Sequence, residues 1–272
     1  SIATSFDSDP EKGTEGKIGK YLALVNYHSN PITSAMFITA TAPNPLVVEL
    51  IAKATNSQIH LSWTTWALAM VLPGVVALAF MPIALYFMYP PEIKKTPNAA
   101  QFAKDRLQEM GPITLHEMIM LAVFGILLLL WAGIPAMLLG DMWTLDPTTT
   151  AFIGLSLLLL TGVLTWDDVL TQKGAWDTVT WFAALVMMAT FLNKLGLIAW
   201  FSGVLQTSIG QLGLTWVPAS MLLLFAYMYA HYIFASTTAH ITAMFSAFYI
   251  AGIALGAPPM FFALIMAAAS SI

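Results

Sequence analysis

A cluster of hydroxyl and amide side chains interrupts a long uncharged stretch near the start of this chain. Residues 21 to 48 contain no Asp, Glu, Lys or Arg, yet TATAPNPL occupies residues 39 to 46. This segment supplies the hydroxyls of Thr39 and Thr41 and the amide of Asn44. Neutral oxygens and N–H donors of this kind can coordinate a small cation or hold a carboxylate without burying a fixed charge.

Two prolines flank the amide of this first cluster. Pro43 and Pro45 lack the backbone N–H, and a proline ring inside a helix clashes with the preceding turn. Carbonyls freed at membrane depth need protein, water or an ion as a partner, and unwound backbone there often lines a binding site. A simple proline kink without a ligand is the alternative. The sequence favours a broken helix whose site residues include Asn44 and Pro45.

A second cluster, STTAH, stands between two apolar arms. Ser236, Thr237 and Thr238 are consecutive hydroxyl residues, and His240 follows them. Three consecutive side chains cannot point the same way on a helix, which favours a turn here. The alternatives are hydroxyls that bond to their own helix carbonyls, and a histidine that is packed in the core. His240 could contact a substrate or carry a proton.

The composition identifies an integral membrane protein. Of the 272 residues, 58% are hydrophobic and only 9% are charged, against about 25% charged residues in soluble domains. The net charge of -4 gives no case for binding nucleic acid. The chain has no cysteine, and its five histidines lack the spacing of a metal motif, so no metal site is predicted. No Ser-His pair, paired Asp or metal-ligand set at helical spacing suggests an enzyme.

The polar segment 90–113 orients the predicted spans. It carries most of the basic residues between the apolar stretches, so the positive-inside rule places it in the cytoplasm. A polar connecting segment, 1–16, begins the chain. Predicted spans and half-helices follow from the apolar stretches: 17–38, 47–57, 63–89, 114–139, 149–164 and 176–193. Residues 194–214 are expected to lie in the outer interface.

Segment 215–257 allows two interpretations. It has two apolar arms around the STTAH cluster, so it predicts either a re-entrant hairpin that enters from outside or two ordinary spans with a short turn. Hydropathy does not separate the two. Residues 258–272 are expected to be the start of a further helix, and the chain to be an interior piece of a longer transporter.

With TSAMFITATAPNPL and YIFASTTAH both present, the chain resembles the divalent anion:sodium symporter family. It is most similar to the branch of bacterial dicarboxylate and tricarboxylate exchangers and plastid 2-oxoglutarate/malate translocators. The resemblance implies an all-α polytopic membrane protein, an inverted-repeat transporter with broken helices and a re-entrant hairpin, of which this chain is one part. It implies transport-domain helices in 17–89 around an unwound loop 39–46, scaffold helices in 114–193, and a hairpin in 215–257.

The family pattern carries over to particular positions. Thr39, Thr41, Asn44 and Pro45 match the first unwound loop, and the residues matching the second hairpin tip are Ser236, Thr237 and Thr238, with His240 beside them. Sodium-coupled members have Ser-Asn-Thr where this chain has Ser-Thr-Thr. This departure favours an exchanger, with sodium as a candidate coupling ion and no other cofactor.

The resemblance implies a secondary active transporter, and no enzyme, that exchanges dicarboxylates such as malate, succinate or 2-oxoglutarate by an elevator-type movement. It further implies a homodimer in contact with membrane lipid, in the bacterial inner membrane rather than the plastid envelope. A sodium-coupled symporter is the first alternative. A membrane scaffold, in which the polar clusters only join helices, is the alternative from another class.

Overall fold

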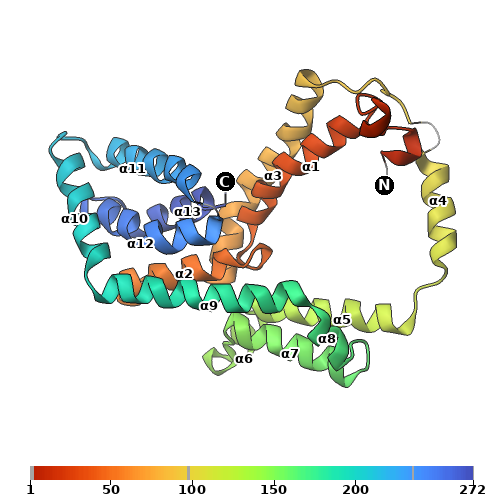
Figure 1. The fold of residues 1–272 in the computed structure, drawn as a ribbon. Helices are drawn as coiled ribbons and strands as arrows, with labels where there is room; N and C mark the ends of the chain where they lie inside the picture. The colour runs from red at the N-terminus through yellow and green to blue at the C-terminus, as the bar shows by residue number, and fades with distance from the viewer. Residues whose placement is uncertain (1–2, 97–98, 235, 272) are drawn as a thin grey trace. The chain divides into compact units, whose positions relative to one another are not determined.

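The computed structural model describes residues 3–96, 99–234 and 236–271, and every regular element in these ranges is a helix (Figure 1). The chain divides into two compact units. Unit 1 consists of Ser1–Tyr27 and Met81–Lys173, and unit 2 consists of His28–Phe80 and Gly174–Ile272. The all-helical membrane architecture expected from the sequence is confirmed.

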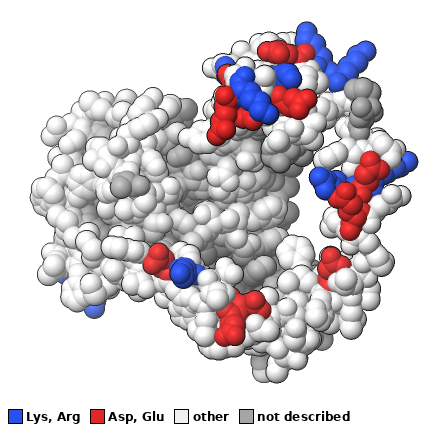
Figure 2. All heavy atoms as spheres, turned by 45° about the vertical axis from the view of Figure 1, so that its right-hand side comes forward, with Lys and Arg blue, Asp and Glu red and all other residues white. Residues whose placement is uncertain are grey.

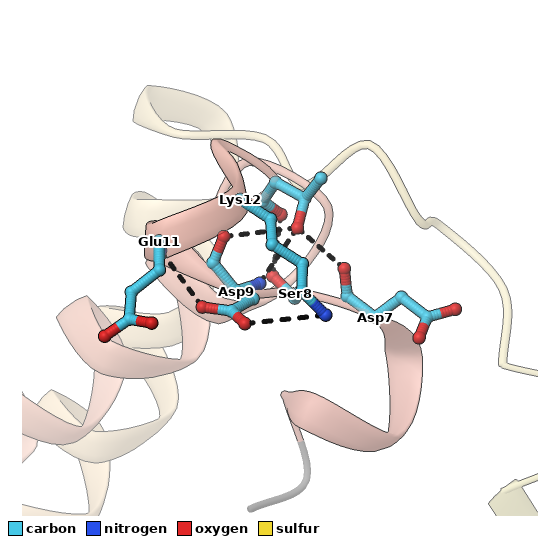
Figure 3. A network of polar contacts seen from close by, with 6 residues as sticks. Asp7, Ser8, Asp9, Glu11 and Lys12 are labelled. Carbon is cyan, nitrogen blue, oxygen red and sulfur yellow. Dashed lines mark hydrogen bonds and ion pairs between the residues drawn. The ribbon is translucent and has the colours of Figure 1, made fainter.

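Unit 1 begins with a polar turn held by side-chain hydrogen bonds (Figure 3). Two short 3-10 helices, η1 (Thr4–Phe6) and η2 (Pro10–Lys12), flank Ser8. The Ser8 hydroxyl donates to the Thr14 carbonyl at 2.9 Å and accepts from the Gly19 N–H at 2.8 Å. This hydroxyl therefore fixes the start of the first long helix, because helix N-termini carry unpaired N–H groups.

The first long helix, α1 (Gly19–Met36), contributes its first turns to unit 1, and α3 (Trp63–Met88) contributes its last turns. The Tyr21 hydroxyl donates to the Pro82 carbonyl at 3.1 Å, and the Lys20 ammonium lies 5.1 Å from the centre of the Tyr89 ring. These contacts pair the two helix ends within unit 1.

Segment 90–113 contains a helix that the sequence did not predict. Helix α4 (Ala99–Met110) precedes α5 (Leu115–Trp131) with a bend of 107° between them. The Thr114 side chain accepts from the Glu117 N–H, and the Glu117 carboxylate accepts from the Thr114 N–H at 2.7 Å. This reciprocal cap satisfies N-terminal donors of α5 and explains why α5 starts as a separate helix at the bend.

Short helices complete unit 1: α6 (Ile134–Leu139), η4 (Asp141–Trp143), α7 (Pro147–Leu160) and α8 (Trp166–Thr171). Asp146 caps α7, and hydrogen bonds from the hydroxyl and N–H of Thr149 hold the pKa of the Asp146 carboxyl below its ordinary value. The hydroxyl and N–H of Thr165 likewise lower the pKa of Asp168 in α8. Both carboxylates are therefore held in the charged form that a helix N-terminus favours.

Unit 2 holds the remaining turns of α1 and α3 and the other helices of the chain. These are η3 (Ile38–Ala40), α2 (Pro43–Ala54), α9 (Lys173–Lys194), α10 (Leu197–Gly210), α11 (Trp216–Ala230), η5 (His231–Ile233), α12 (Thr237–Ala254) and α13 (Pro259–Ala269). Helix α12 lies at the centre of this unit and packs against α2, α10, α11 and α13 (Figure 1).

The core of unit 2 follows from this central position of α12. Phe245 and Tyr249 of α12 are fully buried, as are Tyr227 of α11 and Phe262 of α13. Gly252 lets α13 approach closely, because a Cβ atom built there would lie 2.1 Å from the Phe262 ring. Small residues of this kind allow close helix packing in membranes, where apolar burial alone gives little drive for association.

Helices α11 and α12 run antiparallel. Tyr227 near the end of α11 lies beside His240 near the start of α12, and Trp216 at the start of α11 lies 3.7 Å from a Cβ built on Gly256, just beyond α12. By length and composition, Trp216–Ile233 and Thr237–Ala254 could each cross a membrane. The re-entrant hairpin therefore stays a prediction beside its alternative of two spans.

The compact units divide the chain at other points than the predicted domains. Helix α9 falls in unit 2 rather than with the helices of the predicted scaffold 114–193, and α3 is shared between the units. The transport and scaffold roles of these segments stay predictions. Figure 2 shows Lys, Arg, Asp and Glu side chains gathered in a few places on the face it displays, with wide uncharged surface elsewhere. Four helices are long and apolar enough to cross a membrane, or up to five if the bent α4 and α5 pair is one span, counted over the described residues.

Candidate functional site

The helix break lies slightly earlier than the sequence predicted. Helix α1 ends at Met36, and α2 begins at Pro43, so the interruption covers residues 37 to 42 rather than 39 to 46. Pro43 and Pro45 stand in the first turn of α2. A missing N–H costs nothing there, since the first N–H groups of a helix have no partner within it. The prolines therefore start the second half-helix instead of breaking it.

Asn44 holds the break together from inside. Its side chain is 1% exposed, and its Nδ2 atom donates to the carbonyls of Ser34 at 2.8 Å and Phe37 at 2.9 Å. Carbonyls at the end of a helix lack donors from the next turn. The amide of Asn44 supplies them from the other side of the break, so both N–H groups of this side chain are used within the protein.

Two tryptophans of α3 add further donors to the break. The indole Nε1 of Trp66, a fully buried side chain, donates to the Ala35 carbonyl at 2.8 Å. The indole Nε1 of Trp63 donates to the Thr39 hydroxyl at 3.4 Å, and the Trp63 ring stacks on Phe37 with centroids 5.7 Å apart. Residues three apart share one helix face, which lets both indoles reach the break.

The other candidates of the first cluster are more accessible. Thr39 and Pro45 are exposed, and Thr41 is half-buried in extended backbone with φ of -149°. The Thr41 carbonyl accepts from the Asn44 N–H at 3.2 Å, while its hydroxyl makes no hydrogen bond to another described residue. Thr41 therefore places a free hydroxyl immediately before the N-terminus of α2.

The second cluster forms the start of α12. Ser236 is extended, with φ of -150°, and its hydroxyl accepts from the Ala239 N–H at 3.1 Å, which is the geometry of an N-cap. Thr237 and Thr238 occupy the first turn and are half-buried. Their hydroxyls make no hydrogen bond to other residues that the structure describes. Ala235 lies outside the described residues.

His240 is enclosed by aromatic rings. It is fully buried, with ring centroids 4.2 Å from Tyr227, 5.1 Å from His231 and 5.3 Å from Phe234. Neither ring nitrogen has a hydrogen-bond partner of ordinary geometry among the described residues. An unpaired buried polar group costs about 1–3 kcal/mol. His240 is therefore packed as a core residue, yet it lacks the hydrogen bonds that such a residue normally makes.

The two clusters begin neighbouring helices that run in the same direction. Helix α2 from Leu46 onward and α12 from Ser246 onward line one cavity, and the N-terminal ends of both helices lie toward the same end of unit 2 (Figure 1). No hydrogen bond joins the described residues of one cluster to those of the other. The arrangement is two positive helix ends with free hydroxyls at Thr41, Thr237 and Thr238, which suits a negatively charged ligand.

Sequence analysis missed the roles of three aromatic residues. Trp63 and Trp66 were not among the predicted site residues, although their spacing of three shows that they share a face of α3. Tyr227, whose ring is tilted by 34° against the ring of His240, shares a hydrogen bond with the Ser270 hydroxyl at 2.8 Å. Its position in an apolar helix gave no signal of that contact. In the described part of the chain, no group of three or more His, Asp or Glu side chains is placed to hold a metal ion.

Comparison with known proteins gives the family. The family model described as the sodium:sulfate symporter transmembrane region matches residues 1–272, the whole chain. The chain belongs to this family. The resemblance to divalent anion:sodium symporters is thereby confirmed, and the chain is part of an integral membrane protein.

Several curated relatives align with nearly the whole chain. The "Putative malate transporter YflS" of Bacillus subtilis (strain 168) is 48% identical over 272 residues, which are 100% of this chain and 55% of the relative. The chloroplastic "Dicarboxylate transporter 1" of Arabidopsis thaliana is 43% identical over 272 residues, 100% of this chain and 47% of the relative. "Inner membrane protein YbhI" of Escherichia coli (strain K12) is 36% identical over 264 residues, 97% of this chain and 53% of the relative. The chain thus spans about half the length of these relatives.

Proposed function

We propose that the protein containing this chain is a secondary active transporter of dicarboxylates, and that it works by anion exchange with elevator-type alternating access. Relatives aligned over the whole chain are named malate and dicarboxylate transporters, which supports this substrate class. The observation that carries the proposal is the pair of helix N-termini of α2 and α12, where the hydroxyls of Thr41, Thr237 and Thr238 make no hydrogen bond to the described residues.

The chemistry of this pair suits a carboxylate. The N-terminus of a helix carries the equivalent of roughly half a positive charge, and its free N–H groups point outward. The hydroxyls of Thr41 and Thr237 can donate to carboxylate oxygens, and a divalent anion then binds without a lysine at membrane depth. Thr39, Pro45, Ser236, Thr238 and His240 remain candidate site residues on the same proposal, while both Asn44 N–H groups are already used by backbone carbonyls.

The test is uptake of labelled malate or 2-oxoglutarate into vesicles that hold the full-length protein. An exchanger takes up label only when the vesicles contain unlabelled dicarboxylate. Equal uptake with and without internal dicarboxylate would refute exchange, and no uptake of any dicarboxylate would refute the substrate class.

Sodium-coupled symport is the second candidate, and the family description favours it because it names a sodium:sulfate symporter. The Ser-Thr-Thr sequence at 236 to 238 argues for exchange, since sodium-coupled members have Ser-Asn-Thr there. Replacing sodium with choline in the uptake assay separates the two. Sulfate as a competitor of labelled malate then tests whether the anion site discriminates carboxylate from sulfate.

We further propose a homodimer in the bacterial inner membrane, in contact with lipid. Both bacterial and chloroplastic relatives match the chain, so the location needs a direct test. The test expresses the protein with a fluorescent tag in a bacterial host and fractionates the membranes. Native mass spectrometry of the full-length protein measures the number of subunits. Finding only monomers at all protein concentrations would refute the proposed dimer.

A further inference from the structure

Unit 2 contains a cavity whose lining includes none of the hydroxyl, amide or imidazole side chains of the two polar clusters. The α2–α9 cavity has a volume of about 440 Å³ and lies between α2, α9, α10 and α12. Its lining consists of Leu46, Leu50, Lys53, Ala54, Asn56, Val186, Ala189, Thr190, Asn193, Lys194, Ile198, Ser246 and Ile250. This volume lies in the range of ligand sites, which is roughly 300–1,000 Å³.

The polarity of the lining changes along the cavity. On α2 the lining passes from Leu46 and Leu50 to Lys53, and on α9 it passes from Val186 to Lys194. The eight residues from Val186 to Lys194 rise by about 12 Å in a helix. Helices α2 and α9 run in the same direction (Figure 1), so both present apolar side chains at one end of the cavity and an ammonium group at the other.

The charged end belongs at the membrane surface. Lys194 is the last residue of Lys173–Lys194, a helix long and apolar enough to cross a membrane. The end of such a span lies near the headgroups, where lysine side chains extend into the polar layer. Asn56 and Asn193 add amide groups at the same end, so the cavity has a polar mouth and an apolar floor.

The two ammonium groups can take an anion. Lys194 has no described carboxylate within 4.0 Å and lies over the Phe191 ring at 5.7 Å. Lys53 pairs with Glu49 at 2.6 Å, but both side chains are about half exposed, and exposed pairs of this spacing stabilise a helix by only about 0.3–0.5 kcal/mol. Lysines near a helix C-terminus also favour the helix dipole. That effect does not require two lysines and two amides around one cavity.

We propose that the α2–α9 cavity binds the anionic headgroup of a membrane lipid, with the first part of an acyl chain against its apolar floor. A small dicarboxylate is polar at both ends and gains no favourable contact with a floor of leucine, valine and isoleucine side chains. A lipid matches both ends of the cavity. The proposal goes beyond the transport function, because it holds whatever anion the protein carries.

The experiment measures binding to the purified, delipidated full-length protein. Short-chain phosphatidylglycerol is compared with short-chain phosphatidylcholine by native mass spectrometry. Each lysine near a membrane surface attracts anionic lipid by about 1 kcal/mol, so two lysines give roughly a thirtyfold preference for phosphatidylglycerol. The double variant Lys53→Gln and Lys194→Gln is expected to lose most of this preference and to keep its binding of phosphatidylcholine.

A matched control removes two lysines elsewhere. Lys94→Gln with Lys95→Gln makes the same change of charge at exposed positions of unit 1 and is expected to keep the full preference. Lys53→Arg with Lys194→Arg keeps the charge and is expected to bind phosphatidylglycerol as the unchanged protein does. Equal losses in the glutamine variant and its control, or no preference at all, would overturn the proposal.

A soluble anion is the competing occupant. Malate at rising concentration is expected to leave phosphatidylglycerol bound. Displacement by malate in the unchanged protein, absent from the glutamine variant, would assign the cavity to a soluble dicarboxylate and overturn the lipid proposal. Because binding is measured without transport, this result does not depend on the uptake assay.

Discussion

Unit 2 has two interruptions of its helices, one at the break between α1 and α2 and one at the start of α12. They differ in how far their polar side chains are hydrogen-bonded within the protein. At the break, Asn44 and Trp66 donate to backbone carbonyls, and Trp63 donates to a hydroxyl. At the start of α12, the hydroxyls of Thr237 and Thr238 remain unengaged among the described residues. Asn44 and Trp66 therefore support the local fold, whereas Thr237 and Thr238 remain available to bind a ligand.

This separation has a physical reason. A helix that ends inside apolar surroundings leaves carbonyls whose burial without a partner is costly, so the break must be closed from within before a ligand arrives. A helix that begins also leaves four N–H groups without partners, and at the start of α12 the Ser236 hydroxyl caps one of them. The remaining groups of the first turn are then free for a ligand. We therefore expect stability to depend on Asn44 and Trp66 at the break, and transport to depend on the hydroxyls of Thr41 and of the start of α12.

Replacing Asn44 should have the largest effect. Asn44→Ala leaves the carbonyls of Ser34 and Phe37 without their donor, and each unpaired buried group costs about 1–3 kcal/mol, so we expect a loss of roughly 2–6 kcal/mol in the free energy of unfolding. Denaturant titration of the full-length protein in detergent measures it. The control Asn26→Ala, at an exposed position of α1, should change stability by less than about 0.5 kcal/mol.

A different outcome for Asn44 would reverse its assignment. If Asn44→Ala folds with unchanged stability and loses transport, the amide acts on the ligand, and the break is part of the binding surface like the start of α12. Equal destabilisation by Asn26→Ala would mean that the loss is not specific to the hydrogen bonds of Asn44.

Removing the indole donor of Trp66 should have a smaller effect. Trp66→Phe keeps a large ring in the core but deletes the hydrogen bond to the Ala35 carbonyl, so we expect a loss of about 1–2 kcal/mol. Thermal unfolding measures this loss against Trp200→Phe, an exposed tryptophan of α10. Equal effects of the two variants would mean that the Trp66 indole N–H contributes nothing specific to the break.

The sequence predicts where both interruptions lie, but not which of them uses its polar groups within the protein and which leaves them free. The TATAPNPL segment marked a break, and STTAH marked a turn, because prolines and consecutive hydroxyls conflict with a continuous helix. The two prolines of the first segment misplaced the break by a few residues. They are equally suited to the first turn of a helix, and composition does not say which helix they belong to.

The partner of Asn44 could not be predicted. Its amide can donate equally well to a carboxylate, an ion-bound water or a backbone carbonyl. The carbonyls it reaches are seven and ten residues away, on the far side of a turn whose path depends on packing. The contact of Trp66 with Ala35 spans 31 residues and required α3 to pack against α1. Long-range pairings of this kind come from the fold, not from a local pattern.

Removing a free hydroxyl from the start of α12 should affect transport and leave stability unchanged. Thr237→Ala deletes a group with no hydrogen bond to the described residues, so unfolding should change by less than about 0.5 kcal/mol. A hydrogen bond to substrate is worth about 1 kcal/mol, so the KM for malate should rise about fivefold. Uptake by vesicles measures it beside Thr207→Ala on the exposed face of α10. An unchanged KM would remove Thr237 from the site.

Ser236 gives the smallest expected effect on transport, and it tests whether a side chain at the start of α12 supports the helix as Asn44 supports the break. Its hydroxyl caps the Ala239 N–H, so Ser236→Ala should cost about 1 kcal/mol, whereas Ser236→Gly, a tolerated cap, should cost only a few tenths. If capping is its only role, transport by the glycine variant should match that of the unchanged protein. A KM that rises equally in both variants, despite their different stabilities, would mean that the Ser236 hydroxyl also contacts the substrate. Ser236 would then both support the helix and bind the substrate at the start of α12. At the break these two roles belong to different residues, because Asn44 supports the helix end and Thr41 offers the hydroxyl.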